Sequence, residues 1–255
     1  MIRLCPNCNN DTRRFYNITE ERLQQLLYII APRQTLVFND SLTLRWNDVS
    51  GATQYRVRVG DWERQTDETQ IVYDGELKPG EFYTVKIVAD NGTASTDEDG
   101  GQYSWFIVLE EEEAKTLQEL AGAIELQENE EGEGLILAYF YRGNGLNAKA
   151  IEILEGLVKS GTQTTTVYRL LGDIYQQVGL NLMAKAVYRQ GLSLTTEVES
   201  EVKATIQRQL GEVEYRLGNR DEAVEFLEKA KRSYSALGNE IQVEELTRRI
   251  RAIKN

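Results

Sequence analysis

The sequence has no histidine, only two cysteines and no long apolar run, and each shortage excludes a class of function. Without histidine the chain cannot form a Ser-His-Asp or Cys-His nucleophile system, a histidine-ligated metal site or the usual general base near neutral pH. The longest apolar run, residues 23–31, is interrupted by Gln24 and Gln25 and falls short of the roughly 18 residues that cross a bilayer. Lysine and arginine number 29 against 41 acidic residues, a net charge of −12, which argues against a nucleic-acid binder.

The two cysteines, Cys5 and Cys8, lie in the segment Cys-Pro-Asn-Cys. A tetrahedral zinc site needs four ligands, and the sequence offers no second pair of cysteines or histidines. A thioredoxin-like role needs a βαβ context, which the surrounding pattern lacks. A local disulfide and two free thiols both stay open.

Residues 1–31 form a poorly defined lead-in. Thr19 is a candidate N-cap for a helix over residues 22–30, in which apolar residues recur with helical spacing. Pro32 is expected to end that helix. A strand over residues 26–30 is the alternative.

From residue 32 to 109 apolar residues alternate with polar ones, which is the period of a half-buried strand. The clearest cases are Leu42-Leu44-Trp46, Tyr55-Val57-Val59 and Tyr83-Val85-Ile87-Ala89, with shorter candidates at 35–38, 70–73 and 103–109. Several short strands separated by turns predict an antiparallel β-sandwich.

Two stretches in this region resemble the fibronectin type III family. The run LTLRWNDVSGATQYRVRV looks like its B and C strands, which implies that Trp46 and Tyr55 lie in the core. Residues 77–85 are similar to the E–F corner, where the hydroxyl of Tyr83 would hydrogen-bond the backbone a few residues upstream. The resemblance covers residues 33–109, and an immunoglobulin-like relative remains an alternative.

Residues 110–134 read as an acidic linker that opens with four consecutive glutamates, Glu110 to Glu113. Helical spacing of apolar residues predicts a helix over 111–127, whose acidic first turn suits the positive end of the helix dipole. Residues 128–134 would form the loop into the next domain. An acidic docking segment is the functional alternative.

Residues 167–191, VYRLLGDIYQQVGLNLMAKAVYRQG, organise the remainder of the chain. They place an aromatic, Leu-Gly, Tyr, Ala and a second aromatic at fixed offsets, and so resemble the tetratricopeptide (TPR) repeat. The resemblance implies a helix–turn–helix pair whose helices press together at Gly172 and Ala184. One pair cannot bury its apolar face alone, so neighbouring repeats are expected.

Three repeats can be aligned, at 131–164, 165–198 and 204–237, within an array over residues 135–255. Ala150 and Ala184 lie 34 residues apart, whereas Ala184 and Ala223 lie 39 apart. We expect the five extra residues to lengthen the second helix of repeat two and the first helix of repeat three. Glu214 stands where the pattern has tyrosine, and residues 239–254 read as a capping helix.

The remaining motifs do not indicate catalysis. Residues 97–101 lack the acidic spacing of a calcium-binding loop, and residues 143–145 lack the lysine and third glycine of a phosphate-binding loop. We read 143–145 as the turn between paired helices. We therefore expect no enzyme activity, no catalytic residue, no cofactor and no metal.

The TPR resemblance also implies which side chains line the concave groove, since the first helix of each pair faces it. The slots carried over from the family give ten candidate partner-binding residues: Tyr139, Arg142, Arg169, Asp173, Gln176, Gln177, Arg208, Glu212, Tyr215 and Arg216. Four arginines against two acids predict a mildly basic groove. The chaperone-tail form of the family is not matched, because Asp173 stands where that form has asparagine. Ordinary exposed helix positions in a structural spacer are the alternative.

A multidomain chain with an all-β sandwich followed by an all-α solenoid resembles bacterial scaffold proteins of the cell envelope or of signalling assemblies. We expect a non-catalytic scaffold or adaptor for a protein or peptide partner, an acidic one by the charge of the groove, without nucleic-acid binding or membrane insertion. The alternatives are an accessory region of a larger enzyme or signalling protein, and a cell-wall or carbohydrate binder that stacks sugars on Trp62, Tyr73 or Tyr103. We expect the cytoplasm, or the periplasm if the chain is a mature form or a fragment.

Overall fold

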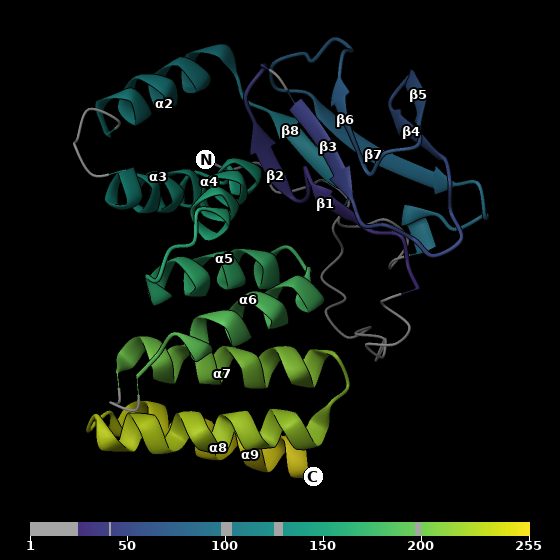
Figure 1. Ribbon diagram of the computed structural model, residues 1–255. Helices are drawn as coiled ribbons and strands as arrows, with labels where there is room; N and C mark the ends of the chain where they lie inside the picture. The colour runs from purple at the N-terminus through teal and green to yellow at the C-terminus, as the bar shows by residue number, and fades with distance from the viewer. Residues whose placement is uncertain (1–24, 41, 98–103, 125–129, 197–199) are drawn as a thin grey trace.

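The computed structural model describes residues 25–40, 42–97, 104–124, 130–196 and 200–255 (Figure 1). In these ranges eight strands come first and eight α-helices follow, so the chain is an N-terminal β region joined to a helical array. Figure 1 shows the β region beside the first helices, with α8 and α9 at the opposite end of the array.

The strands of the β region form two sheets. The three-stranded sheet has the order β1 (Ile29–Ala31), β3 (Leu42–Trp46), β6 (Gln70–Tyr73). The five-stranded sheet has the order β2 (Thr35–Val37), β8 (Trp105–Val108), β7 (Phe82–Ala89), β4 (Tyr55–Val59), β5 (Trp62–Thr66). All pairings are antiparallel except that of β2 with β8. A 3₁₀ turn, η1 (Ser95–Asp97), follows β7.

One hydrophobic core lies between these sheets, because alternate residues of the strands point inward. Leu44 and Trp46 from one sheet and Val57, Ile87 and Phe106 from the other are at most 2% exposed. The rings of Trp46 and Tyr55 meet edge to face at 5.5 Å. The expected core positions of these two aromatic residues are therefore confirmed.

All six strands expected from alternation are present, as β2, β3, β4, β6, β7 and β8. The expected helix over 22–30 is wrong in its described part, because Ile29–Ala31 pairs with β3 and buries Leu27 and Ile29. Strand β5 was not expected, because its sequence Trp-Glu-Arg-Gln-Thr is polar and it pairs with β4 alone. Its pairing partner, and not its own pattern, makes it a strand.

The helices form a lead helix, three hairpins and a final helix. They are α2 (Glu111–Ile124), α3 (Glu130–Gly143), α4 (Asn147–Lys159), α5 (Thr165–Gln177), α6 (Asn181–Ser193), α7 (Glu201–Arg216), α8 (Arg220–Ala236) and α9 (Glu240–Lys254). We call α3 to α9 the array. The helix expected in the acidic linker exists as α2, and its buried Leu117 and Ala121 pack on the array core. The loop expected up to residue 134 is shorter, because α3 begins at Glu130.

Each hairpin turns at a glycine with positive φ, namely Gly145, Gly179 and Gly218 at 76°, 84° and 84°. A side chain at such a backbone conformation is strained, so glycine ends each first helix there. The expectation that residues 143–145 form a turn between paired helices is confirmed.

The five extra residues of the third repeat are divided between a connection and a helix. The connection over 194–200 is two residues longer than that over 160–164, and α7 starts three residues earlier relative to its central glycine than α5 does. Helix α6 has 13 residues, as α4 has. The expected lengthening of the first helix of repeat three is therefore confirmed, and that of the second helix of repeat two is wrong.

Gly172 lies where α5 meets α6, and the side chain that comes nearest to it is that of Tyr188. A Cβ atom built on Gly172 would lie 2.4 Å from the Tyr188 ring. Tyr188 lies one helical turn beyond Ala184. Its ring can approach the α5 backbone this closely because glycine has a hydrogen atom in place of a side chain. In the next hairpin Gly211 and Leu227 repeat this contact, with a Cβ at 2.6 Å.

Replacing Gly172 with alanine should destabilise the protein by about 1–3 kcal/mol, because the added methyl group overpacks the contact with Tyr188. The matched control is Gly156→Ala in α4, where nothing lies within 4 Å of the new Cβ. That change should stabilise by up to about 1 kcal/mol through helix propensity. Urea unfolding of both variants measures the difference, and equal effects would contradict the assigned packing.

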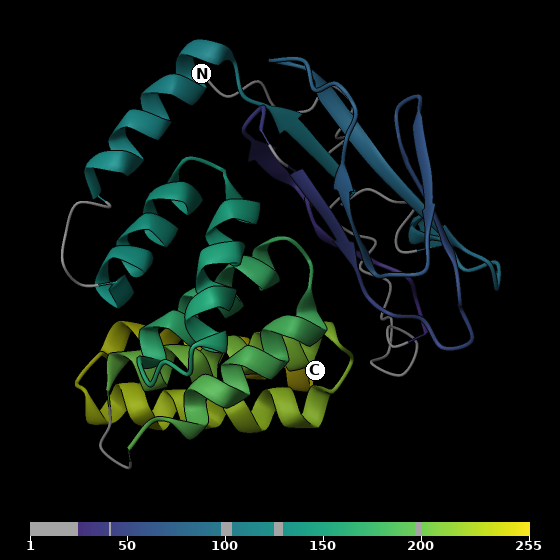
Figure 2. The same ribbon diagram turned by 45° about the horizontal axis from the view of Figure 1, so that its top comes forward.

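The β region docks on the turn between α3 and α4 through its edge strand β2. The amide of Leu36 donates to the carbonyl of Gly145 at 2.9 Å, and the amide of Ala148 donates to Thr35 Oγ1 at 3.1 Å. A free strand edge carries unpaired backbone groups that favour aggregation. Here the array covers the edge, because β2 lies beside α4 (Figure 2).

Polar and apolar side chains strengthen this junction. Arg33 is 1% exposed and donates from Nε to the carbonyl of Val178 at 2.6 Å, which ties the β region to the end of α5. Arg45 on β3 forms a two-point ion pair with Glu155 on α4, at 2.7 and 3.0 Å. Phe38 belongs to the array core and meets Tyr141 at 6.2 Å.

Because of this junction we expect the β region and the array to unfold together, and not as the separate units that their sequence periodicities suggest. All three tryptophans lie in the β region, so tryptophan fluorescence follows that part while circular dichroism at 222 nm follows the helices. The two midpoints should coincide in urea. Arg33→Ala should separate them, because it leaves the Val178 carbonyl without its buried donor.

A wild-type protein with two distinct midpoints would contradict this account. Arg232→Ala, on the exposed face of α8 away from the junction, is the control and should keep the midpoints together.

Candidate functional site

The first helices of the repeats lie side by side, and α9 continues the row. Arg169 on α5 donates from Nη2 to Tyr139 on α3 at 2.5 Å, and Arg249 on α9 binds Glu212 on α7 at 2.9 and 2.8 Å. We call the surface made by these contacting residues of α3, α5, α7 and α9 the inner face. All ten residues predicted for the groove lie on α3, α5 and α7.

Asp173 is the centre of a polar cluster on this face. Its Oδ2 accepts from Arg169 Nη1 at 2.8 Å and lies 3.7 Å from Arg142 Nη1. Its Oδ1 accepts from the hydroxyl of Tyr188 at 2.6 Å and from Gln209 Nε2 at 3.4 Å. The Asp173 side chain is only 9% exposed. A carboxylate at this depth needs such partners, so Asp173 holds two arginines in place and is not itself open to a ligand.

A second cluster lies at the α7–α9 end of the face. The two-point ion pair of Glu212 with Arg249 fixes the guanidinium, which also stacks over the Tyr215 ring at 4.4 Å. The hydrogen bonds that Arg249 donates to Glu212 raise the pKa of the Arg249 guanidinium. Arg249 was missed in the sequence because residues 239–254 were read only as a cap.

Several predicted residues are less accessible than expected. Arg169 and Arg208 were taken as exposed but are half-buried, because Asp173 and Tyr139 hold the first and α9 approaches the second through Gln242 at 3.4 Å. Gln176 is buried, and its carbonyl accepts from Arg216 at 3.4 Å. The exposed members are Tyr139, Gln177 and Arg216.

The inner face carries more positive than negative charge. It holds five arginines, at 142, 169, 208, 216 and 249, and three carboxylates, Asp173, Glu212 and Glu245, the last of which accepts from Gln242 at 3.0 Å. The basic character inferred from four arginines thus extends over α9.

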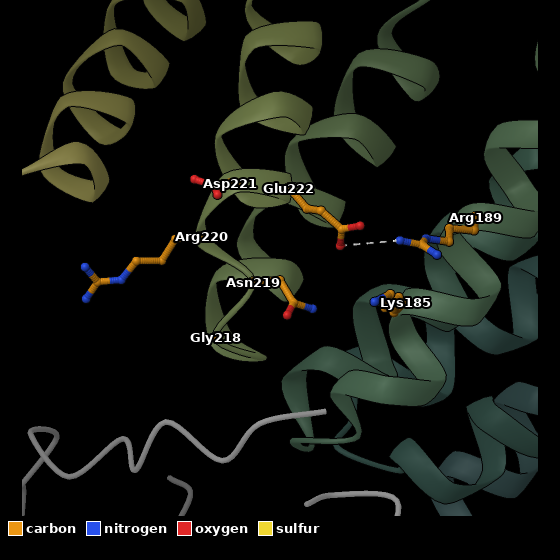
Figure 3. A pocket seen from close by; sticks show the side chains of 7 residues that line it. All are labelled: Lys185, Arg189, Gly218, Asn219, Arg220, Asp221 and Glu222. Atoms are coloured by element: carbon orange, nitrogen blue, oxygen red, sulfur yellow. Dashed lines mark ion pairs between the residues drawn. The ribbon is translucent and has the colours of Figure 1, made fainter. Parts of the chain in front are cut away.

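A different charged cluster lies between α6 and α7, around Glu214. This carboxylate is fully buried and binds Lys185 at 3.0 Å, Arg189 at 2.8 Å and Asn219 Nδ2 at 2.8 Å. Arg189 also faces Glu222 at 3.7 Å (Figure 3). Since Glu214 occupies the slot of Tyr175, the departure from the repeat pattern is compensated by cations on α6.

A hollow of about 550 Å³ opens beside this cluster. It is lined by Lys185, Arg189, Gly218, Asn219, Arg220, Asp221 and Glu222. Its cations are matched by the neighbouring carboxylates, so it shows no charge that would select a ligand.

Of the three aromatic residues considered for carbohydrate binding, two lie in the part of the chain that the structure describes. Tyr73 is 8% exposed and packs at 4.9 Å against Trp62, whose Nε1 donates to Asp74. Tyr103 lies outside the described residues. Phe82, which is exposed, stacks on the partly buried Trp105 at 5.8 Å on the outer side of the five-stranded sheet.

Among the described residues, no three Asp, Glu, Cys or His side chains gather closely enough to hold a metal ion. Cys5, Cys8 and residues 98–101 lie outside that range. In the same part of the chain, no helix combines the length and apolar character needed to cross a bilayer.

Two buried tyrosines should make stability fall at high pH. Burial raises the pKa of Tyr175 and of Tyr188. The carboxylates that accept hydrogen bonds from these hydroxyls, Glu155 for Tyr175 and Asp173 for Tyr188, raise both pKa values further. Above about pH 10 the unfolded chain releases tyrosine protons that the folded chain keeps, so the free energy of unfolding decreases as pH rises.

The double variant Tyr175→Phe/Tyr188→Phe should lose stability less steeply between pH 9 and 11, as measured by urea unfolding at each pH. An unchanged slope would show that these hydroxyls do not control the alkaline loss.

Comparisons with known proteins found a family model and several solved structures that are similar to part of this chain. Residues 163–236 match the tetratricopeptide repeat family model. The solved structure of MamA is 21% identical over 55% of this chain and 85% of its own, with a TM-score of 0.39. The TPR-like repeats of a protein from Podosopora anserina, described as a kinesin light chain, are 22% identical over 56% and 86%, with a TM-score of 0.40.

A third structure, BtubC (BKLC) from P. vanneervenii, is 17% identical over 56% of this chain and 72% of its own, with a TM-score of 0.36. No curated protein matches the chain. The family match spans α5 to α8 and so covers the segments aligned as repeats two and three.

Proposed function

We propose that the protein is a non-catalytic interaction scaffold whose inner face binds an acidic peptide or an acidic segment of a partner protein. TPR modules are protein-interaction modules, and the family match covers two repeats here. The observation that carries the proposal is the row of five arginines on the alternate helices α3, α5, α7 and α9, in a protein whose net charge is −12.

The arginines are held in place before any partner arrives. Asp173 fixes Arg169, and Glu212 fixes Arg249, each through hydrogen bonds of 2.8–2.9 Å. A guanidinium group has five N–H donors, so both can still bind a carboxylate through their remaining donors. Side chains that are already ordered lose less entropy on binding. This favours a partner that brings carboxylates to fixed positions.

Aromatic side chains accompany the arginines. Tyr139 is 42% exposed and bonded to Arg169, and Tyr215 lies under Arg249. Tyrosine and arginine are the residues that most often dominate binding energy at interfaces. We therefore expect the partner segment to place an apolar or aromatic residue among its acids.

The test uses the full chain and a fluorescein-labelled acidic peptide with a free C-terminal carboxylate. Arg142→Gln/Arg216→Gln removes two charges of the inner face while leaving the half-buried Arg169 and Arg208 untouched. Binding measured by fluorescence anisotropy should weaken about tenfold, since each pair of partly exposed charges contributes up to about 1 kcal/mol. Higher salt should weaken wild-type binding as well.

The matched control is Arg220→Gln/Arg232→Gln, which removes two exposed charges from α8, outside the inner face. It should bind like the wild type. Equal loss in both variants would mean that only net charge matters, and no loss in either would reject the inner face as the site.

We also propose that the β region is a fibronectin type III-like sandwich. Two observations support this assignment. The amide of Lys78 donates to the hydroxyl of Tyr83 at 2.9 Å, as the resemblance to the E–F corner implied. The two sheets also share one core between a three-stranded and a five-stranded layer. A noncatalytic β module of this kind suits a scaffold that presents a second surface.

A further inference from the structure

The outward side of the five-stranded sheet carries an ordered row of side chains that the inner face does not involve. We call it the outer sheet face. Strand register places its residues in rows: Val88, Arg56 and Gln65; then Lys86, Arg58 and Glu63; then Thr84 and Trp105; and finally Phe82 and Ile107. The intervening residues, such as Val57, Val85 and Phe106, fill the core. The rows therefore face away from the three-stranded sheet.

The middle of this face is basic. Arg56 and Arg58 have side chains about half exposed, and a single carboxylate, Glu63, lies between them in ion pairs with both. Lys86, directly across from Arg58, is exposed and makes no ion pair with any described residue. Three cations against one acid leave a positive excess in a strongly acidic protein.

One end of the outer sheet face is aromatic, and the other end is hollowed. At one end Phe82, 48% exposed, stacks on Trp105 with ring centroids 5.8 Å apart. At the other end a hollow of about 260 Å³ is lined by Arg56, Gln65 and Val88 together with Gln54, Tyr55, Ala89 and Asp90. The exposed Phe82 ring offers a partner an apolar surface that Trp105 already holds in place.

We propose that the outer sheet face binds an extended acidic segment of a partner polypeptide, with carboxylates on alternate residues and an aromatic residue at one end. Arg56 and Arg58 are two residues apart on one strand, about 6.6 Å, which is also the spacing of alternate side chains in an extended peptide. Glu63 shows how a carboxylate fits between these guanidinium groups. This site is separate from the inner face and does not depend on the function proposed there.

The probe is a fluorescein-labelled, C-terminally amidated peptide of alternating glutamate and threonine with one terminal tyrosine. Its affinity for the full chain is measured by anisotropy, and its position by amide chemical shifts of the labelled protein. Arg56→Gln/Lys86→Gln should weaken binding about tenfold, and Phe82→Ser should weaken it several-fold. Shifts should concentrate on β4, β7 and β8.

The controls separate this site from the inner face and from other ligands. Arg142→Gln/Arg216→Gln and Arg220→Gln/Arg232→Gln should both keep the probe-induced shifts on β4, β7 and β8, and a glutamine version of the peptide should not bind. Urea midpoints near that of the wild type show that each variant is folded.

Three results would overturn the proposal: shifts confined to α3, α5 and α7, equal loss with the inner-face variant, or unchanged binding in Arg56→Gln/Lys86→Gln. If heparin, a sulfated polysaccharide, binds the face and the peptide does not, the partner is a polyanionic sugar and the polypeptide proposal fails.

Discussion

The contact of the edge strand β2 with the α3–α4 turn is the constraint on which the rest of the structure depends. The backbone of Leu36 and the side chain of Thr35 bond the turn at Gly145 and Ala148, and Arg33 reaches the end of α5. These groups are buried. Separating the β region from the array would therefore expose their backbone donors and acceptors, together with the Phe38 ring, to water. The β region is therefore part of the first repeats' packing, and its orientation relative to the inner face is fixed.

Charge is distributed in this molecule according to a simple rule. Buried carboxylates, Asp173 and Glu214, are each surrounded by arginine, lysine or amide donors, as burial of a charge requires. Most of the acidic excess lies elsewhere, for example in the first turn of α2. As a result the inner face and the outer sheet face are both basic within an acidic protein. Two such surfaces on one fixed body would let a scaffold hold two acidic segments at a defined separation.

Periodicity predicted most of the secondary structure, because the apolar pattern directly reflects which face is buried. It predicted β3, β4 and β7 and the helices of the array, and glycine at 145, 179 and 218 marked the turns. It failed for β5, whose stability comes from pairing with β4 and not from its own apolar residues. For residues 22–30 it left a helix and a strand over 26–30 open, and the pairing of β1 with β3, 17 residues away at Ile29 and Trp46, favours the strand.

The repeat pattern predicted which residues line the candidate site, but it did not predict how exposed their side chains are. The repeat pattern indicated which residues of α3, α5 and α7 share a face, and contacts such as that of Arg169 with Tyr139 agree with it. Burial of Arg169 and Arg208 depends on neighbours far along the chain, Tyr139 and Gln242, which no local pattern reveals. The buried role of Arg33 could not be predicted for the same reason, since an isolated arginine before a short strand is normally exposed.

The most direct test of the fixed arrangement is the distance between spin labels on the β region and the array. Cysteines replace Asp67 and Gln190, which are both exposed, while Cys5 and Cys8 are changed to serine. Pulsed electron paramagnetic resonance should then give one narrow distance distribution, and Arg33→Ala should broaden it. A broad or multi-peaked distribution in the protein with Arg33 intact would contradict the account, because the junction would not hold the two parts as one body.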